Sequence, residues 1–365
     1  MILSSFLTSL LNVGVKCLSI VLALAILLFL ILIHELGHYT FGKIFKFKIN
    51  EFSIGFGKPI YSKIKKDGEK FSIRVIPLGG FCAFEGEDEE GNDHPQSFNN
   101  QKAWKRLLVL LGGVLFNFIT TVIFSIFLLS VVGTGVPKIG AMTGANAEFI
   151  KAGDELVEIN GEKPSFVNGG MQFILNEWDE KKPITLVIKR EGVEELITQK
   201  VYLQPFEDSL GDTYYALGIT KYDYQKYSVG KAILYSVPYS FEMAYDCLEL
   251  IFNLITGKLS LKYVGGPITT INAMSQSFEI GITDSLLSTL KNMLLLFPLL
   301  SVNLAVFNAL PIPALDGARM VFVLIEWIRK KPINRDLEAK IHFWGLVALF
   351  GFVVIIEFLQ FTVFR

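Results

Sequence analysis

The feature that most constrains this chain is a run of apolar residues, 11–33, that leads directly into the sequence His-Glu-Leu-Gly-His at 34–38. Lys16 is the only charged residue in the run, which is long enough to cross a bilayer as a helix. Histidines four residues apart share one helix face and can bind the same metal ion. Ionisable groups inside a membrane segment are costly and usually functional. The stretch therefore indicates a metal site at or within a membrane.

The motif alone leaves an alternative open. So short a pattern also occurs by chance, and two histidines at a helix end can simply lie in the lipid headgroup region. A third metal ligand in a second membrane segment would favour the metal site.

Composition supports a membrane protein. Of 365 residues, 51% are apolar and 31 are Phe, which predicts membrane helices with an inserted soluble part. The net charge of −1 gives no indication of nucleic-acid binding. Three scattered cysteines form neither a zinc knuckle nor a disulfide framework. The first segment lacks a basic start and a small-residue cleavage site, so we expect it to be retained.

The predicted fold is a mainly α-helical membrane protein with four transmembrane helices, a membrane-associated β-hairpin region and one inserted α+β domain. In chain order we expect the first transmembrane helix with its His-Glu motif (1–45), a cytoplasmic or membrane-associated β-region and loop (46–106), the second transmembrane helix (107–132), the inserted domain (133–206), a connector with an amphipathic surface helix (207–290), the third transmembrane helix (291–318), a cytoplasmic loop (319–340) and the fourth transmembrane helix (341–365).

The β-region is predicted from alternation. Residues 51–57 and 71–77 alternate apolar and polar side chains, and Asp67-Gly68 between them is typical of a hairpin turn. Beside a membrane helix, such strands should pack on helices or line a cavity. An ordinary cytoplasmic hairpin is the alternative.

Two helices are expected outside the membrane spans. One lies within the inserted domain at about Asn168–Trp178. The other is the amphipathic stretch 228–261, which Pro238 should interrupt and which we expect to lie along the membrane surface.

Charge predicts the topology. Basic clusters follow the first and third membrane helices, namely Lys43, Lys46 and Lys48, and then Arg329, Lys330, Lys331 and Arg335. By the positive-inside rule both loops are cytoplasmic. Both termini and the inserted domain should then be extracytoplasmic.

Asp316 is the candidate for the third ligand. A catalytic zinc site usually takes three protein ligands and leaves one position open. Asp316 follows a membrane helix broken by Pro311 and Pro313, on the same side as His34 and His38. A helix cap or a salt bridge to Arg319 is the alternative. The predicted cofactor is therefore Zn²⁺, with Glu35 as the general base and acid and not a ligand.

The predicted chemistry of the zinc site and Glu35 is hydrolysis of a peptide bond. A peptide bond in a membrane helix is protected by the hydrogen bonds of that helix, so a substrate helix must unwind locally before it is cleaved. Strand edges within 50–84 are predicted to hold the extended peptide by strand addition. Asn308, Asn117 and Pro311 are the candidate residues for binding the substrate or the oxyanion.

These motifs together resemble the site-two proteases, a family of intramembrane zinc metalloproteases, and specifically their RseP-type bacterial branch. His34–His38 matches the first motif of that family. Residues 52–57 and 76–81 resemble its membrane-associated β-region, and Asn308–Gly317 matches its Asn-x-x-Pro-x-Pro-x-Leu-Asp-Gly motif. Ala152–Gly161 resembles a PDZ domain, which the branch places outside the cell between the second and third helices.

The resemblance implies zinc on His34, His38 and Asp316, with Glu35 as acid–base. It implies a protein of the bacterial inner membrane whose substrates are single-span membrane proteins. Examples are anti-sigma factors already trimmed by an upstream extracytoplasmic protease, or remnant signal peptides. The PDZ domain would exclude untrimmed substrates.

Two departures from the family pattern stand out. The second-helix motif Gly-Pro-x-x-Asn reads Gly113-Val114-Leu-Phe-Asn117, without the proline. Relatives often have Gly-His after Asp-Gly, whereas this chain has Ala318-Arg319. A catalytically silent protein that captures partners through its PDZ domain is the alternative function, although the intact metal motifs argue against it. A transporter would show inverted repeats, and none is evident.

Overall fold

The computed structural model describes residues 2–87, 94–133, 138–161, 163, 181–207, 213–223, 226–257, 261 and 264–363. The chain forms two compact units. One contains the residues up to Phe124 and from Ile251 onward, and the other is Ser125–Leu250.

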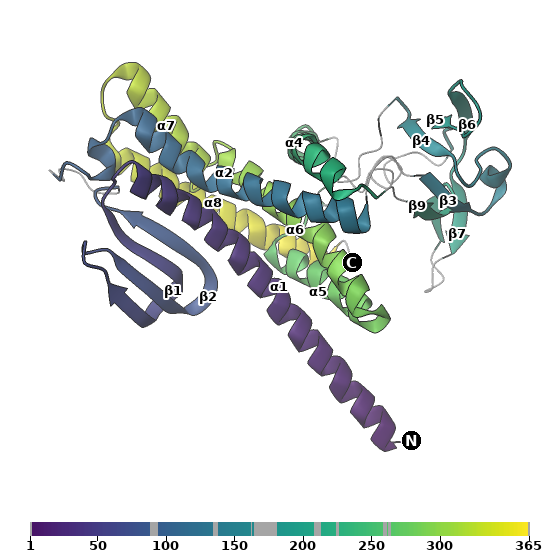
Figure 1. The fold of residues 1–365 in the computed structure, drawn as a ribbon, viewed down its shortest axis with the longest axis horizontal. Helices are drawn as coiled ribbons and strands as arrows, with labels where there is room; N and C mark the ends of the chain where they lie inside the picture. Colours follow the sequence, from purple (N-terminus) through teal and green to yellow (C-terminus); the bar gives the residue numbers. More distant parts are fainter. Residues whose placement is uncertain are drawn as a thin grey trace. The chain divides into compact units, whose positions relative to one another are not determined.

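Among the described residues, four helices are long and apolar enough to cross a membrane. They are α1 (Ile2–Ile44), α2 (Ala103–Phe127, extended by the helical turn η2, Leu128–Val132), α6 (Leu286–Ala309) and α8 (Arg335–Thr362) (Figure 1). Their apolar sequences need no polar partner because every backbone group is satisfied within the helix. The predicted class, a mainly helical multi-pass membrane protein with small antiparallel sheets, is confirmed.

Helix α7 (Asp316–Arg329) occupies part of the stretch 319–340, which was predicted as a cytoplasmic loop, so the expectation of a loop without a helix was wrong. Its amphipathic face buries Val323 in an aromatic core, and Glu326 forms a buried ion pair with Arg106 of α2 at 2.5 Å. The basic residues at its end obscured this short periodic pattern.

The predicted hairpin is present as β1 (Ile49–Ile64) and β2 (Lys70–Phe84), with Gly68 at a φ of +84° in the turn. Residues 49–54 pair with 80–84, residues 51–54 also pair with 70–73, and residues 59–64 pair with 70–74. Several register shifts divide each long strand into two paired segments. The hairpin lies beside α1 (Figure 1).

Two further helices follow the second unit's strands. Helix α4 (Val229–Ile255) continues through Pro238, so the expected interruption there was wrong. The proline removes one helical hydrogen bond without ending the helix. Helix α5 (Pro267–Asp284) falls in the expected connector but packs against α1 and α6, where Met274 contacts a buried cluster with Leu30.

The second unit is built on a five-stranded sheet of order β6-β5-β4-β3-β9. Its strands are β3 (Lys138–Met142), β4 (Glu155–Ile159), β5 (Ile184–Lys189), β6 (Ile197–Val201) and β9 (Ile219–Asp223). The same unit contains a separate strand pair, β7 (Gln204–Glu207) and β8 (Thr213–Ala216), and a short helical turn, η3 (Ala145–Glu148). A similar turn in the first unit is η1 (Phe98–Asn100).

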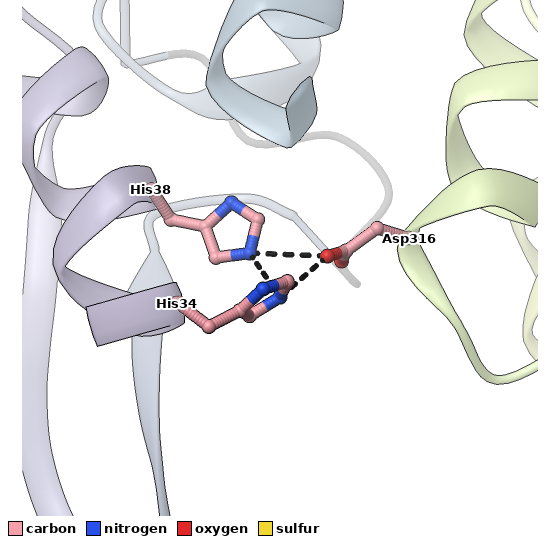
Figure 2. Close-up of side chains that lie close together, drawn as sticks. All are labelled: His34, His38 and Asp316. Atoms are coloured by element: carbon pink, nitrogen blue, oxygen red, sulfur yellow. Dashed lines mark hydrogen bonds and ion pairs between the residues drawn. The ribbon is translucent and has the colours of Figure 1, made fainter. Parts of the chain in front are cut away.

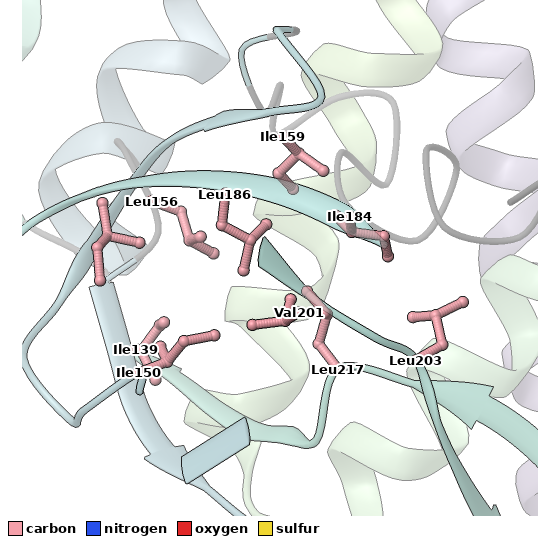
Figure 3. Close-up of a cluster of buried hydrophobic side chains, with 10 residues drawn as sticks. Ile139, Ile150, Leu156, Ile159, Ile184, Leu186, Val201, Leu203 and Leu217 are labelled. Atoms are coloured by element: carbon pink, nitrogen blue, oxygen red, sulfur yellow. The ribbon is translucent and has the colours of Figure 1, made fainter. Parts of the chain in front are cut away.

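Ten buried apolar side chains form the core of this sheet, among them Ile139, Leu156 and Leu186 (Figure 3). Strand β9 pairs with β3, so the sheet extends beyond residue 206, where a connector was expected to begin. Strand order depends on tertiary contacts, which a short polar and aromatic stretch does not reveal. The helix expected at Asn168–Trp178 lies outside the described residues.

Candidate metal centre

His34 and His38 lie one turn apart on the same face of α1. Both side chains are buried, and their Nε2 atoms are 3.1 Å apart. The two rings are nearly perpendicular, at 84°. The helix thus places two imidazole nitrogens side by side, as the spacing predicted.

Asp316 completes a three-residue cluster. Its Oδ2 lies 2.8 Å from Nε2 of His34 and 3.1 Å from Nε2 of His38 (Figure 2). Within the part of the chain that the structure describes, this is the one group of three or more metal-ligating side chains that converges, with ligand atoms within 4.8 Å of one another.

The turn between α6 and α7 delivers Asp316 to the histidines. Helix α6 ends at Ala309, and α7 begins at Asp316 itself. A Cβ on Gly317 would collide with the carbonyl oxygen of Leu310, so only glycine allows the two helix ends to approach this closely. The Asp316 carboxylate lies in the first turn of α7, where the helix dipole favours a negative charge.

A backbone carbonyl orients His38. The Nδ1 atom of His38 lies 2.9 Å from the carbonyl oxygen of Val109 in α2. Since a carbonyl can only accept, Nδ1 carries the proton and donates it. The lone pair of Nε2 is then directed at Asp316, which is the tautomer that a metal ligand needs.

Asn117 orients His34 in a similar way. The Asn117 amide nitrogen lies 3.2 Å from Nδ1 of His34, and its amide oxygen is buried without a partner among the described residues. Amide nitrogen and oxygen are assigned from the hydrogen-bond network. The opposite amide orientation lets the oxygen accept the Nδ1 proton, which leaves Nε2 free for a metal. Because Asn117 is fully buried, its amide is better placed to orient His34 than to bind a substrate.

Asn308 and Pro311 lie on the chain leading to Asp316. Asn308 is half-buried in the last turn of α6, and Pro311 is exposed in the following turn. Within the described residues neither forms a hydrogen bond with the three clustered side chains. Their roles in binding substrate or oxyanion remain predictions.

Gly113 of α2 lies directly against both imidazoles. A Cβ there would be 2.6 Å from Nε2 of His38 and 2.7 Å from Nε2 of His34. No side chain fits without displacing the two nitrogens. The sequence identified Gly113 as part of the second-helix motif, and its contact with the histidines was not predicted.

Glu35 is held next to β2. An added Cβ on Gly80 of β2 would be 3.6 Å from the Cγ of Glu35, so this side chain lies against the strand. Sequence analysis missed the contribution of Val109, because a backbone carbonyl carries no side-chain signal.

The charge of Asp316 suits a metal ligand. Two imidazoles and one carboxylate form a donor set typical of catalytic zinc. The buried donors, their fixed tautomers and the lack of a side chain at Gly113 all fit a zinc ion. Arg319, one turn beyond Asp316, forms an ion pair with Glu87.

Comparison with known proteins identifies the family. The model of peptidase family M50 matches residues 22–352. The chain belongs to peptidase family M50. This M50 protein is 31% identical over 343 residues to a candidate zinc metalloprotease of Fusobacterium nucleatum, covering 92% of this chain and 96% of the relative. It is also 31% identical over 362 residues to one of Helicobacter pylori strain J99, covering 93% and 97%.

Family membership identifies the metal that the three clustered side chains are suited to bind. The M50 protein is a zinc metalloprotease with a candidate metal site at His34, His38 and Asp316. Its four long apolar helices make it a multi-pass membrane protein.

Proposed function

We propose that this M50 zinc metalloprotease cleaves peptide bonds inside the membrane-spanning segments of single-span membrane proteins. The observation that carries the proposal is the position of the cluster. His34 and His38 lie within the apolar span Val13–Ile44, and Asn117 lies within the span Ala103–Val132. A centre built on these two helices is suited to substrates that reach it from the bilayer.

We assign the catalytic roles as follows. Zinc, when bound, supplies a Lewis acid for activating water and the peptide carbonyl. His34, His38 and Asp316 hold the ion, while Val109 and Asn117 keep the imidazoles in the required tautomer. Glu35 accepts the proton of the attacking water and passes it to the leaving amine.

The edge of β2 is the proposed site for the unwound substrate. Residues 80–84 pair with β1, and Gly80 among them lies next to Glu35, with an added Cβ 3.6 Å from the Glu35 Cγ. An extended peptide added along the Glu35 side would lie next to the metal centre. Strand addition would also replace the hydrogen bonds that the substrate helix loses when it unwinds.

The proposed topology follows from the basic loops. With the clusters after α1 and α7 in the cytoplasm of a bacterium, both termini and the sheet of the second unit are extracytoplasmic. The metal centre then lies toward the cytoplasmic side of the inner membrane.

The proposed substrates are trimmed anti-sigma factors or remnant signal peptides, as in the RseP-type branch. An upstream extracytoplasmic protease would trim the former. The second unit would act as a single PDZ-type filter that excludes substrates with bulky extracytoplasmic parts. Its sheet with a well-filled apolar core is compatible with that role.

The alternative is a catalytically silent protein that only captures partners. The convergence of three ligand side chains and the placement of Glu35 beside them favour the enzyme. Capture would require none of this chemistry.

The test is cleavage of a tagged single-span peptide in liposomes, with and without a zinc chelator. Glu35→Gln removes the proton acceptor but keeps the size of the side chain, so we expect activity to fall by about 100- to 10,000-fold. Zinc content, measured by elemental analysis, should remain that of the wild type.

Chelation should abolish cleavage by the wild type. Turnover by Glu35→Gln at the wild-type rate would refute the assigned role. A zinc-loaded wild type that cleaves none of several helix-destabilised peptides would favour the capture protein.

A further inference from the structure

The turn that carries Asp316 contains a strained residue. Ala314, two positions before Asp316, has a φ of +80°. A residue with a Cβ rarely adopts this left-handed conformation, which persists only where the surroundings hold it. The position of Asp316 therefore depends on the contacts that keep Ala314 in this conformation.

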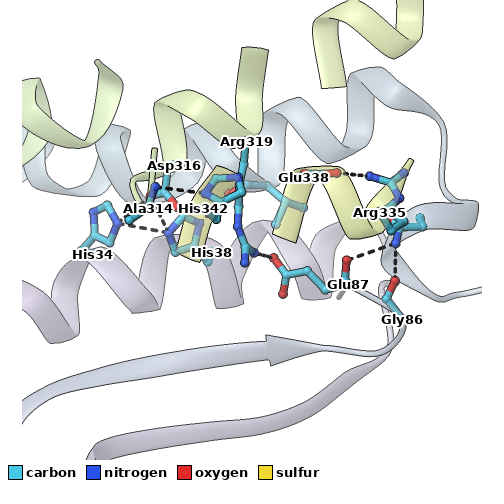
Figure 4. Close-up of polar contacts among 12 residues, drawn as sticks. His34, His38, Gly86, Glu87, Ala314, Asp316, Arg319, Arg335, Glu338 and His342 are labelled. Atoms are coloured by element: carbon cyan, nitrogen blue, oxygen red, sulfur yellow. Dashed lines mark hydrogen bonds and ion pairs between the residues drawn. The ribbon is translucent and has the colours of Figure 1, made fainter. Parts of the chain in front are cut away.

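One face of α8 contacts this turn at two points. His342 lies with its Nδ1 atom 3.0 Å from the backbone nitrogen of Ala314 (Figure 4). Gly345, three residues later on the same face, lies so close to Pro313 that an added Cβ would collide with the proline ring. The helix thus contacts two consecutive residues of the turn.

The hydrogen bond from Ala314 determines the protonation of Nδ1 of His342. A backbone N–H can only donate, so Nδ1 of His342 is the acceptor and must be unprotonated. The ring of Phe322 in α7 packs against His342 with the ring centroids 5.6 Å apart. The imidazole is therefore held between the turn and the helix that begins at Asp316.

We propose that His342 is a positioning residue for the metal centre: by accepting the Ala314 N–H, it holds the strained turn that sets the place of Asp316. His342 contacts neither the ion nor the substrate and acts only through Ala314. The proposal rests on the assigned ligand role of Asp316, but not on the identity of any substrate.

The test uses the full-length protein in detergent and compares two substitutions. His342→Phe keeps a ring of similar size but removes the acceptor. His342→Asn keeps an acceptor, because its Oδ1 takes a place close to that of Nδ1. Zinc affinity is measured by competition with a chromogenic chelator, and the ligand geometry by the visible spectrum of the cobalt-substituted protein.

We expect His342→Phe to weaken zinc binding by about 10- to 100-fold, the range typical of substitutions that disturb the support around a metal ligand, and to alter the cobalt spectrum. His342→Asn should restore most of the affinity and the wild-type spectrum. Gly345→Ala places a methyl group against Pro313 and should also weaken zinc binding and alter the cobalt spectrum. This variant replaces His342→Phe in the test if His342→Phe does not fold.

Ile356→Ala is the matched control for general destabilisation of α8. Ile356 is buried in the same helix at 2% exposure, outside the contact with the turn. It should lower Tm while leaving zinc affinity and the cobalt spectrum unchanged. If His342→Phe behaves like this control, or if His342→Asn is as defective as His342→Phe, the proposal is wrong. These readouts need no cleavage, so they stand even if the proposed substrates are not cut.

Discussion

At the scale of single residues, Gly113 sets how closely α2 approaches the two histidines. Gly113→Ala would place a methyl group about 2.6 Å from Nε2 of His38, closer than any ordinary contact. We expect the ligands to move apart, because the helix backbone has little freedom to retreat. A displacement of about 1 Å typically costs about 100-fold in activity, and zinc affinity should fall with it.

Gly351→Ala provides the control for this substitution. Gly351 lies within α8 and has no atom within 4 Å of an added Cβ. The extra methyl group should leave zinc content and cleavage at the wild-type level. Normal zinc binding by Gly113→Ala would contradict this prediction and show that α2 or the histidines can move to accommodate the methyl group.

The residues of the cluster differ in how far the sequence could predict them. His34 and His38 followed from helical spacing, and Asp316 from a charge at a broken membrane helix. The partner of Asn117 and the contact of His342 with Ala314 did not, because each joins helices distant in sequence. Such pairings depend on packing, which local pattern does not encode.

At the scale of elements, long apolar runs were predictable and short or capped elements were not. The four membrane helices follow from hydrophobic length alone. Helix α7 was missed because its 14 residues end in a basic cluster. Strand β9 was missed because its partner, β3, lies far back in the chain. Helix α5 was not predicted because its N-terminus is capped from another helix.

That cap is Glu357 of α8. Its carboxylate accepts the backbone N–H of Ile268 at 2.6 Å and that of Thr269 at 3.2 Å, and it also accepts the Thr269 hydroxyl at 2.8 Å. Glu357 is buried, so Glu357→Ala leaves these donors without a partner. We expect the free energy of unfolding to fall by about 1–3 kcal/mol. Thermal unfolding in detergent measures this change.

Hydrogen exchange locates the effect of this substitution. The amides of Ile268 and Thr269 should exchange faster in Glu357→Ala, whereas those in the middle of α2 should not. Glu357→Gln keeps one acceptor oxygen and should lose less stability. Unchanged exchange at both amides in Glu357→Ala would show that another group caps α5.

At the scale of the whole molecule, the second unit has the properties of an insertion. It has its own apolar core and its own sheet. The chain enters the sheet after Gly133 and leaves it before Tyr227, whose backbone nitrogen lies 3.0 Å from the carbonyl oxygen of Leu129. Entry and exit are therefore close together, as expected for an inserted domain.

This geometry defines a deletion that tests the proposed filter. Residues 138–223 should be removed together, because a deletion that ended near residue 203 would leave β9 without its partner β3. A short Gly/Ser linker can join the two ends, since the neighbouring backbone is already hydrogen-bonded. We expect this variant to retain zinc and to cleave a single-span peptide with a short extracytoplasmic tail at the wild-type rate.

The decisive comparison is a second peptide with the same membrane segment and a folded extracytoplasmic domain. The wild type should cut it poorly, whereas the deletion variant should cut both peptides alike, because a filter acts on access and not on the metal centre. Zinc content and Tm establish that the variant is folded. A folded, zinc-loaded variant that cuts neither peptide would mean that the second unit takes part in catalysis. Unchanged discrimination between the peptides would place the filter within the membrane helices.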